Sequence, residues 1–322
     1  MPDQADLLII DRFQNDFLQR LQALEHYNVR YYPDVAPDRV DELLEQAEVL
    51  LLRSKVPLDT ARLAKALQLK AVIRAGAGLE EIDHATLEAR GIPLLSCAGA
   101  NANSVGEFAL GLLIGLMHHQ NRANREVQDY HWEREANRGY ELTQRTVGII
   151  GYGHTGRAFA RKLLGFDCRI LAYDPYNPPK HDDLATGASL EQIQSEAEVL
   201  SFHVPLTDET RGYYSADFQQ NMQKQHWLLN CARGEVVDLD AVLDGLSAGK
   251  LKGAGIDVLP NENIAKLEGA ARERYERLAH HPDIILTPHI AGRTFESEDE
   301  INRMVMAHLA YLETHVLEKA SA

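Results

Sequence analysis

The sequence has few of the features that mark secreted, membrane-bound or metal-binding proteins. It has three cysteines among 322 residues, Cys97, Cys168 and Cys231, and their odd number and wide spacing predict neither a disulfide framework nor a zinc site. The longest apolar run, residues 108–117, is too short to span a bilayer. Residues 1–6 are acidic and lack the basic start of a signal peptide, so a cytoplasmic location is the default expectation.

Positive charge is also scarce. Lysine and arginine number 33 against 48 acidic residues, which gives a formal net charge of −15. This charge disfavours nucleic acids and anionic membranes as partners, because neither is attracted without a strong local basic patch. A site for a small anion must therefore gather positive charge locally, and the candidates are Arg53, Arg74 and Arg233. With 45% hydrophobic residues, the chain is long enough for two cores.

Residues 146–174 carry the most informative motif of the chain. A short apolar run at 147–150 leads into Gly151, Gly153 and Gly156, which have the G-x-G-x-x-G spacing at a strand-to-helix junction. The glycines allow a tight turn, close approach of the backbone to a pyrophosphate, and close packing of helix on strand. The N–H groups at the start of the helix attract phosphates. This pattern predicts a dinucleotide site, in which His154 and Thr155 fill the variable positions of the loop.

An acidic residue follows the glycine motif at the end of the next predicted strand. Asp174 comes eighteen residues after Gly156, where a carboxylate can accept hydrogen bonds from the ribose hydroxyls of the adenosine half. A 2′-phosphate at this place would meet like charge. The sequence therefore predicts NAD, rather than NADP, as the cofactor.

The motif lies unusually late, after about 145 residues that can form another domain. Alternation of strand-like and helical patterns there indicates parallel strands with helical crossovers. The segments are 7–10, 13–24, 49–52, 60–69, 72–74 and 92–95. The fold class expected for the whole chain is α/β, with two Rossmann-like, doubly wound parallel sheets.

Further strands are expected after the glycine motif, at 199–204, 227–230, 255–258 and 284–286, with Asp257 inside the third. In a doubly wound sheet, ligands bind outside the carboxyl ends of the strands. Arg233, Glu262 and His289 each follow one of these strands. Taken singly, each could be a surface ion pair, a solvated loop residue or a turn residue; together they predict a site at one edge of the sheet.

The chain resembles the D-isomer-specific 2-hydroxyacid dehydrogenases, a family of NAD-linked enzymes, over most of its length. The matching segments are RAGAGLEEID at 74–83, ANANSVGEFALGLLIGL at 100–116, GYGHTG at 151–156, HVPLT at 203–207, NCARGEVVD at 230–238, GIDV at 255–258 and TPHIAG at 287–292. The resemblance implies a discontinuous substrate domain, residues 1–99 and 291–322. It also implies a continuous NAD-binding domain, residues 100–290.

The resemblance assigns the chemistry to three residues. His289 is implied as the general acid in reduction and the general base in oxidation, with Glu262 behind it to orient the imidazole. Arg233 is implied to bind the substrate carboxylate and to polarise the keto oxygen. One departure concerns Glu262: Asn263 follows it where relatives usually have proline. The longer segment 264–281 then intervenes, and its apolar spacing predicts an amphipathic helix that packs rather than acts.

The resemblance also implies a set of binding residues and no metal. Additional NAD contacts are implied in or after the four later strands, with Asp257 accepting from the nicotinamide carboxamide; these residues are His203, Val204, Pro205, Cys231, Ala232, Asp257 and Gly292. Packing is the alternative reading for Cys231. Backbone N–H groups around a glycine-rich turn are implied for the substrate carboxylate, at Ala75, Gly76, Ala77 and Gly78, with Asn101 beside them.

The substrate is harder to infer from the sequence. Arg53 and Arg74 resemble the phosphoglycerate dehydrogenase branch, in which arginines near these positions hold a phosphate, and this implies oxidation of D-3-phosphoglycerate in serine synthesis. A surface ion pair is the alternative for each arginine. The chain leaves no room for the regulatory domain of longer relatives, so serine feedback is not expected. Glyoxylate or hydroxypyruvate reduction is the alternative activity, and an NAD-sensing corepressor is the alternative of another class. A homodimer formed through residues around 104–140 is implied.

Overall fold

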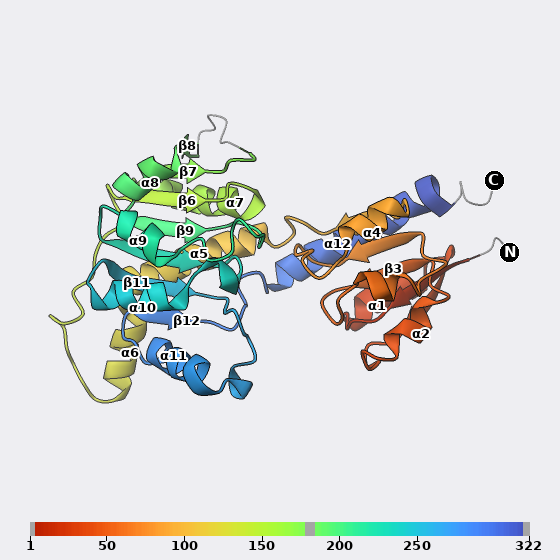
Figure 1. Ribbon diagram of the computed structural model, residues 1–322, viewed down its shortest axis with the longest axis horizontal. Helices are drawn as coiled ribbons and strands as arrows, with labels where there is room; N and C mark the ends of the chain where they lie inside the picture. The colour runs from red at the N-terminus through yellow and green to blue at the C-terminus, as the bar shows by residue number, and fades with distance from the viewer. Residues whose placement is uncertain (1–3, 178–183, 318–322) are drawn as a thin grey trace. The chain divides into compact units, whose positions relative to one another are not determined.

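The computed structural model describes residues 4–177 and 184–317, which form two compact α/β units (Figure 1). One unit combines Met1–Asn101 with Thr294–Ala322, so it is discontinuous in sequence, whereas the other is the continuous stretch Ala102–Arg293. We call them the N-terminal unit and the NAD-binding unit. Within the described residues, no helix is both long and apolar enough to cross a membrane.

The N-terminal unit is built on five parallel strands in the order β2-β1-β3-β4-β5. The strands are β1 (Ala5–Ile9), β2 (Tyr27–Tyr31), β3 (Val49–Leu52), β4 (Ala71–Arg74) and β5 (Leu94–Ser96). Successive side chains of a strand point to opposite faces, so Leu7 and Ile9 pack in one core cluster and Leu8 in the other. Both faces of this sheet are therefore buried.

Helices cover both faces of that sheet. α1 (Asn15–Gln22) and α12 (Phe295–Leu312) contribute to one core cluster, and α2 (Val40–Leu44), α3 (Thr60–Leu63) and α4 (His84–Ala89) contribute to the other. The last helix of the chain thus completes the core of the N-terminal unit. Val305, Leu309 and Leu312 are fully buried there, and the Tyr27 hydroxyl donates to the carbonyl of Leu309 at 2.9 Å.

The NAD-binding unit has seven parallel strands in the order β12-β11-β10-β9-β6-β7-β8. They are β6 (Thr146–Ile150), β7 (Arg169–Tyr173), β8 (Thr186–Gly187), β9 (Val199–Phe202), β10 (His226–Asn230), β11 (Leu251–Ile256) and β12 (Ile284–Leu286). The strand order reverses between β6 and β9, so the crevice where doubly wound sheets bind ligands lies outside the carboxyl ends of these two strands. The glycine motif starts directly after β6.

Two layers of helices enclose the seven-stranded sheet. One core cluster includes α5 (Ala102–Met117) and α7 (His154–Leu163), and the other includes α8 (Leu190–Glu196), α9 (Ala216–Asn221) and α10 (Leu239–Ser247). α5 and α7 pack very closely, because a Cβ on Gly106 would lie 2.8 Å from the backbone carbon of Ala158. α6 (Gln120–Gln128) and α11 (Gly269–Ala279) complete the unit. The expected α/β class with two doubly wound parallel sheets is confirmed.

Several predicted elements differ in detail from the observed ones. Asp257 does not lie inside a strand but directly after β11, at its carboxyl end. The helix predicted over 60–69 is only the four-residue α3, which ends before Leu67, a side chain that is 75% exposed. The segment 264–281 is a short 3-10 turn, Ile264–Lys266, followed by α11, of which only Leu278 is fully buried. The apolar spacing therefore overstated how much of this insertion packs.

Candidate active site

The turn after β6 is shaped by its first and third glycines. Gly151 has a φ of 89°, and a Cβ there would lie 2.6 Å from the carbonyl oxygen of His203. A Cβ on Gly156 would lie 2.2 Å from the oxygen of Gly151. A Cβ on Gly153 would meet nothing within 4 Å, so the backbone beside it is open. Gly153 is the N-cap of α7, and this loop therefore presents open backbone at a helix N-terminus, which suits a pyrophosphate.

Asp174 follows β7 and its carboxylate is held by the backbone. One oxygen accepts from the N–H of Tyr152 at 2.9 Å, and the other accepts from the N–H groups of Tyr176 and Asn177 at 3.0 and 2.8 Å. These three bonds fix the carboxylate beside the glycine loop, because Tyr152 lies within that loop. The residues present therefore fit an adenosine ribose next to a bound pyrophosphate. His154 and Thr155, which begin α7, are exposed and partly exposed.

His203 lies at the carboxyl end of β9, on the other side of the strand-order reversal. Its Nε2 bonds the Ser201 hydroxyl at 2.8 Å, and its ring lies 5.4 Å from that of Phe159 in α7. Burial lowers the pKa of His203 to about 4, so the imidazole is neutral at physiological pH. The side chain therefore packs under the loop, while Val204 and Pro205 are the more exposed residues here.

The turn after β10 carries Arg233. The buried Asn230 side chain accepts from the N–H of Ala232 at 3.1 Å and donates to the carbonyl of Arg233 at 2.9 Å, which closes the turn. A Cβ on Gly234 would lie 2.0 Å from the carbonyl carbon of Leu259, so this turn touches the backbone that leads to Glu262. Burial raises the pKa of the Cys231 thiol, which favours the packing reading for this residue.

Asp257 is the anchor of the loop that contains His289. Its carboxylate accepts from the Thr287 hydroxyl at 2.6 Å and from the N–H groups of Ile290 and Ala291 at 3.0 and 2.8 Å. Its carbonyl also accepts from the His289 N–H at 2.7 Å. Asp257 is 1% exposed, and these bonds satisfy a buried charge that would otherwise be costly. The sequence predicted a cofactor contact for this acid but not its part in holding the loop of His289.

His289 and Glu262 are brought together. The Nδ1 atom of His289 lies 2.8 Å from a Glu262 carboxylate oxygen, and the side chains are 47% and 51% exposed. His289 has a φ of 56°, in the left-handed region that residues other than glycine seldom adopt. Such strain persists only where the surrounding bonds enforce it, and Asp257 supplies these bonds. The loop thus holds a partly exposed imidazole in a fixed direction, against a carboxylate.

Ser104 ties α5 to the same loop. Its hydroxyl donates to the carbonyl of Ala291 at 2.6 Å, and both groups are buried. Helix capping is the obvious reading for a serine in the first turn of α5, but the hydroxyl bonds residue 291 instead. This contact joins residues 187 positions apart, so no local pattern could reveal it. Gly292 follows directly.

The predicted substrate-binding residues lie in the N-terminal unit. Arg53 follows β3 and Arg74 ends β4, while Ala75 is buried and donates its N–H to the Leu52 carbonyl at 2.8 Å. The Gly76 N–H bonds the Arg74 carbonyl at 2.8 Å, so neither amide projects unpaired toward a ligand. The other predicted substrate-binding residues are at least partly exposed to solvent: Ala77, Gly78 and Asn101.

Comparison with known proteins agrees with this architecture. Residues 110–291 match the family model of the D-isomer specific 2-hydroxyacid dehydrogenase, NAD binding domain. The chain is 33% identical to a hydroxypyruvate reductase of Thermotoga maritima over 82% of this chain and 84% of that protein. It is also 33% identical to a D-3-phosphoglycerate dehydrogenase of Haemophilus influenzae, over 88% of this chain and 68% of that protein.

A solved structure extends the comparison to both units. The D-lactate dehydrogenase of Aquifex aeolicus, in complex with NAD and lactic acid, is 26% identical and superposes with a TM-score of 0.85 over 97% of this chain and 96% of that one. Together with the glycine loop, Asp174 and the seven-stranded sheet, these matches identify NAD as the cofactor. The chain belongs to the family of D-isomer-specific, NAD-dependent 2-hydroxyacid dehydrogenases.

Proposed function

We propose that the chain interconverts a small 2-oxo acid and its D-2-hydroxy acid, with Arg233, Glu262 and His289 as the catalytic residues. The observation that carries the proposal is the loop after β12. There Asp257 holds His289 in a left-handed conformation and Glu262 bonds its ring. A packing or turn residue needs no such arrangement. The family membership supports the same reaction class.

The direction of the His289 ring determines which nitrogen exchanges the proton. An ionised carboxylate can only accept hydrogen bonds, so the Nδ1 atom facing Glu262 carries a hydrogen. The Nε2 atom is then the one that donates a proton to the substrate oxygen during reduction and removes it during oxidation. Glu262 stabilises the imidazolium and fixes its orientation. Bound NADH supplies the hydride in reduction.

Arg233 is proposed to bind the substrate carboxylate. A guanidinium has a planar fork of donors that matches a carboxylate, and it can polarise a keto oxygen at the same time. Its turn is fixed by Asn230 and packed by Gly234 against Leu259, upstream of Glu262. The backbone of Ala77 and Gly78 and the side chain of Asn101 are proposed as further substrate contacts, whereas the N–H groups of Ala75 and Gly76 are already bonded to carbonyls of the chain.

The proposed cofactor contacts follow the carboxyl ends of the strands in the NAD-binding unit. The glycine loop would bind the pyrophosphate, and Asp174 the adenosine ribose. Asp257 is engaged by its own loop, so any contact with the nicotinamide carboxamide is added to those bonds. The remaining proposed contacts are His154, Thr155, His203, Val204, Pro205, Cys231, Ala232 and Gly292.

Two substrates are candidates, and each has a specific observation in its favour. Arg53 and Arg74 are proposed to contact the tail of the substrate; their positive charges, together with the similarity to a phosphoglycerate dehydrogenase, favour 3-phosphohydroxypyruvate and a role in serine biosynthesis. The similarity to a hydroxypyruvate reductase of comparable length favours hydroxypyruvate or glyoxylate. The relative rates with the phosphorylated and the unphosphorylated acid distinguish the two candidates.

The test is oxidation of NADH with 3-phosphohydroxypyruvate, hydroxypyruvate, glyoxylate and pyruvate assayed in parallel. Turnover of at least one of them, lost in Glu262→Gln and kept in the control Glu268→Gln, is the expected result. Glu268 lies before α11 in the same region and has no proposed role. NADH binding without turnover of any 2-oxo acid would contradict the enzyme and favour an NAD-sensing protein.

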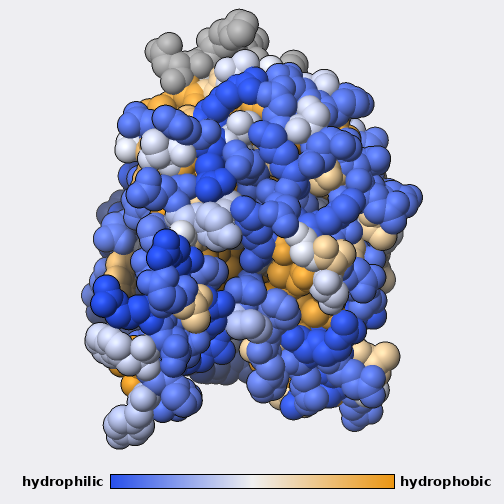
Figure 2. Space-filling model, turned by 90° about the vertical axis from the view of Figure 1, so that its left-hand side faces the viewer, coloured by the Kyte–Doolittle hydropathy of each residue, from blue (hydrophilic) through white to orange (hydrophobic). Residues whose placement is uncertain are grey.

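We also propose a homodimer formed through the segment that follows α6. Residues 129–140 expose large side chains: Tyr130 is 98% exposed and Trp132 is 76% exposed. This segment lies at the left edge of Figure 1, on the side that Figure 2 draws, where the surface is mainly hydrophilic. Exposed apolar patches on a hydrophilic surface mark interaction sites.

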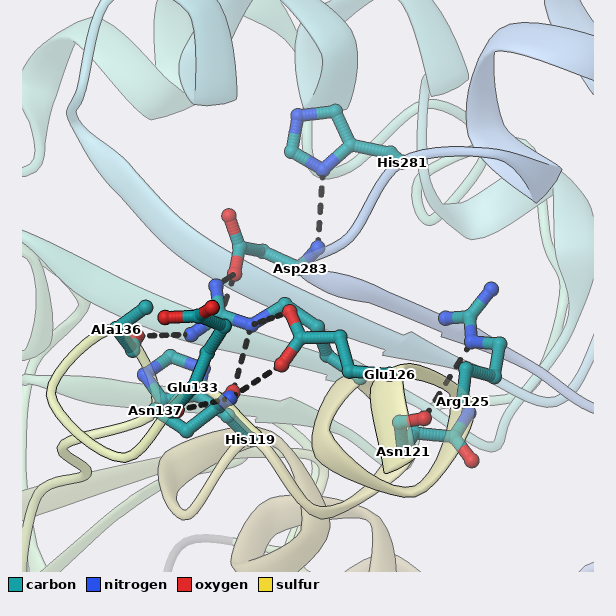
Figure 3. Close-up of polar contacts among 10 residues, drawn as sticks. His119, Asn121, Arg125, Glu126, Glu133, Ala136, Asn137, His281 and Asp283 are labelled. Carbon is teal, nitrogen blue, oxygen red and sulfur yellow. Dashed lines mark hydrogen bonds and ion pairs between the residues drawn. The ribbon is translucent and has the colours of Figure 1, made fainter. Parts of the chain in front are cut away.

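The segment is held in place by a polar network (Figure 3). Arg122 donates to the Asn137 side chain at 2.9 Å and to the Ala136 carbonyl at 2.5 Å, and it forms an ion pair with Asp283 at 3.5 Å. The Asn137 side chain in turn donates to Glu126 and to the Glu133 carbonyl. The aromatic side chains thus project from a backbone that is already ordered, which lowers the entropic cost of association.

Light scattering on Trp132→Glu tests this surface. We expect the wild-type chain to run as a dimer and the variant as a monomer, because a buried carboxylate at an interface is costly. Tyr176→Glu, a 73% exposed aromatic residue elsewhere on the same unit, is the matched control and should leave the dimer intact. A monomeric wild-type chain at micromolar concentration would contradict the proposal.

A further inference from the structure

The ligand crevice of the N-terminal unit is predicted by its topology. Its strand order reverses between β1 and β3, and ligands of such sheets bind outside the carboxyl ends of the strands at the reversal. Asp11 follows β1 and Arg53 follows β3 directly. The Arg53 N–H donates to an Asp11 carboxylate oxygen at 2.7 Å, so the two residues lie together at this point.

The guanidinium of Arg53 is already engaged by an acid from a distant helix. Glu298, in the first turns of α12, forms an ion pair with Arg53, and both side chains are only 22% exposed. The guanidinium also lies over the Phe13 ring, 4.6 Å from its centroid. The buried Nε atom of Arg53 has no hydrogen-bond partner among the described residues. That donor is buried, and the charge of the guanidinium is already neutralised by Glu298.

Arg74, the second arginine of this region, is also surrounded by acids. Burial lowers its pKa, and the negative charges of Asp11, Glu81 and Glu80 act in the opposite direction. Its Nη1 atom donates to the Ala75 carbonyl at 3.2 Å. Two guanidinium groups therefore share their surroundings with four carboxylates, Glu298 included. Because the guanidinium charges are already balanced, this region does not attract a phosphate dianion. The carboxylates would repel the phosphate strongly, since charges that are partly buried interact strongly at short range.

We propose that Glu298 is a specificity-determining residue that neutralises Arg53 and makes the N-terminal unit select 2-oxo acids with an uncharged tail over phosphorylated ones. This inference rests on the proposed function, in which Arg53 contacts the substrate tail. A phosphate carries about two negative charges, and to bind Arg53 it would have to displace Glu298 and leave that carboxylate unpaired. An uncharged tail, such as the hydroxyl group of hydroxypyruvate, does not compete with Glu298 for the guanidinium and leaves the ion pair intact.

The experiment compares wild type with Glu298→Gln and Glu296→Gln. Both substitutions remove one negative charge from the start of α12, but only Glu298 pairs with Arg53, whereas Glu296 is exposed. The readout is the ratio of kcat/KM for 3-phosphohydroxypyruvate to that for hydroxypyruvate. We expect hydroxypyruvate to be preferred by wild type, and Glu298→Gln to raise the ratio at least about tenfold, given the strength of partly buried charge interactions. Glu296→Gln should leave it unchanged.

A second readout does not depend on turnover. Calorimetric binding of 3-phosphoglycerate, in the presence of NADH, should tighten in Glu298→Gln and not in Glu296→Gln. Adding Arg53→Gln should cancel this gain, and Arg53→Gln alone should weaken binding further, because it leaves the Glu298 carboxylate unpaired beside the ligand. An unchanged ratio and unchanged binding in Glu298→Gln would overturn the inference and leave the proposed reaction standing. Absence of turnover with every 2-oxo acid would overturn the proposed reaction, and binding would still decide the role of Glu298.

Discussion

The two units share one architecture but fill the point where the strand order reverses in different ways. In the NAD-binding unit this point is backbone: Gly151 and Gly156 leave no room for a side chain, because the carbonyl of His203 faces Gly151 and the carbonyl of Gly151 faces Gly156. In the N-terminal unit the same point is occupied by charged side chains, with Arg53 placed between Asp11 and Glu298. A site formed by backbone groups suits a cofactor whose phosphates are always the same. A site formed by side chains can change its substrate preference through a single substitution.

The largest effect expected in this comparison is that of His289, the proposed catalytic side chain of the NAD-binding unit. His289→Asn should lower kcat about a thousandfold, since positioned general acid–base groups contribute roughly 10²–10⁴-fold. The dissociation constant for NADH should stay the same, because His289 is not among the proposed cofactor contacts. His280→Asn, at an exposed histidine at the end of α11, is the control. A variant that retains more than a tenth of the activity would move the proton-transfer role to another residue.

The units should also differ in their response to acid. Burial lowers the pKa of both His203 and His226 to about 4, from 6.5 in an unfolded chain. Because the unfolded chain binds more protons between these values, the NAD-binding unit loses stability as the pH falls from about 6.5 to about 4, by up to roughly 3 kcal/mol per histidine.

The N-terminal unit should lose stability at a lower pH than the NAD-binding unit does. Hydrogen bonds from Lys65 and Arg62 lower the pKa of Asp41 below its usual 3.8, so this contribution disappears only as the pH falls toward and through that lowered value. Hydrogen exchange followed by mass spectrometry at a series of pH values distinguishes the two units. If the N-terminal unit opened at a higher pH than the NAD-binding unit, His203 and His226 would not be the groups that set the acid stability of the protein.

The smallest of these effects concerns the glycine loop. Gly156→Ala forces a Cβ against the Gly151 oxygen, and overpacking of this kind costs about 1–3 kcal/mol. Both the melting temperature and the affinity for NADH should fall. Gly153→Ala meets no neighbour within 4 Å, so it should leave the melting temperature unchanged and weaken only NADH binding. Equal melting temperatures for the two variants would contradict the close packing at Gly156.

The sequence predicted the NAD-binding unit better than the N-terminal unit, and the reason is physical. The glycine spacing, buried strands and acid after β7 are local features with a fixed geometry, so they could be read in order. The β2 strand was missed because Tyr27–Tyr31 has only one fully buried residue and no apolar run. The pairing of Arg53 with Glu298 joins residues 245 positions apart, and no local pattern reports such a contact.

In the candidate site, too, the local features could be predicted from the sequence and the contacts between distant residues could not. The positions of Arg233, Glu262 and His289 after their strands could be predicted, and the contact between His289 and Glu262 agrees with the expected pairing. The role of Asp257 in holding the loop was not predicted, because its position inside a strand was wrong by one residue and its partners lie 30 to 34 positions away. Which backbone groups a buried carboxylate meets depends on the tertiary fold.

The packing of α12 has a consequence for the order in which the chain folds during synthesis. β1 and β3 leave the ribosome early, but the core cluster that contains Leu7 and Ile9 also needs Val305 and Leu309 from the last helix. All strands of the NAD-binding unit are complete before α12 is made. The NAD-binding unit can therefore fold while the first strands of the chain still lack part of their core. Those strands are then the segment most exposed to chaperones and to aggregation.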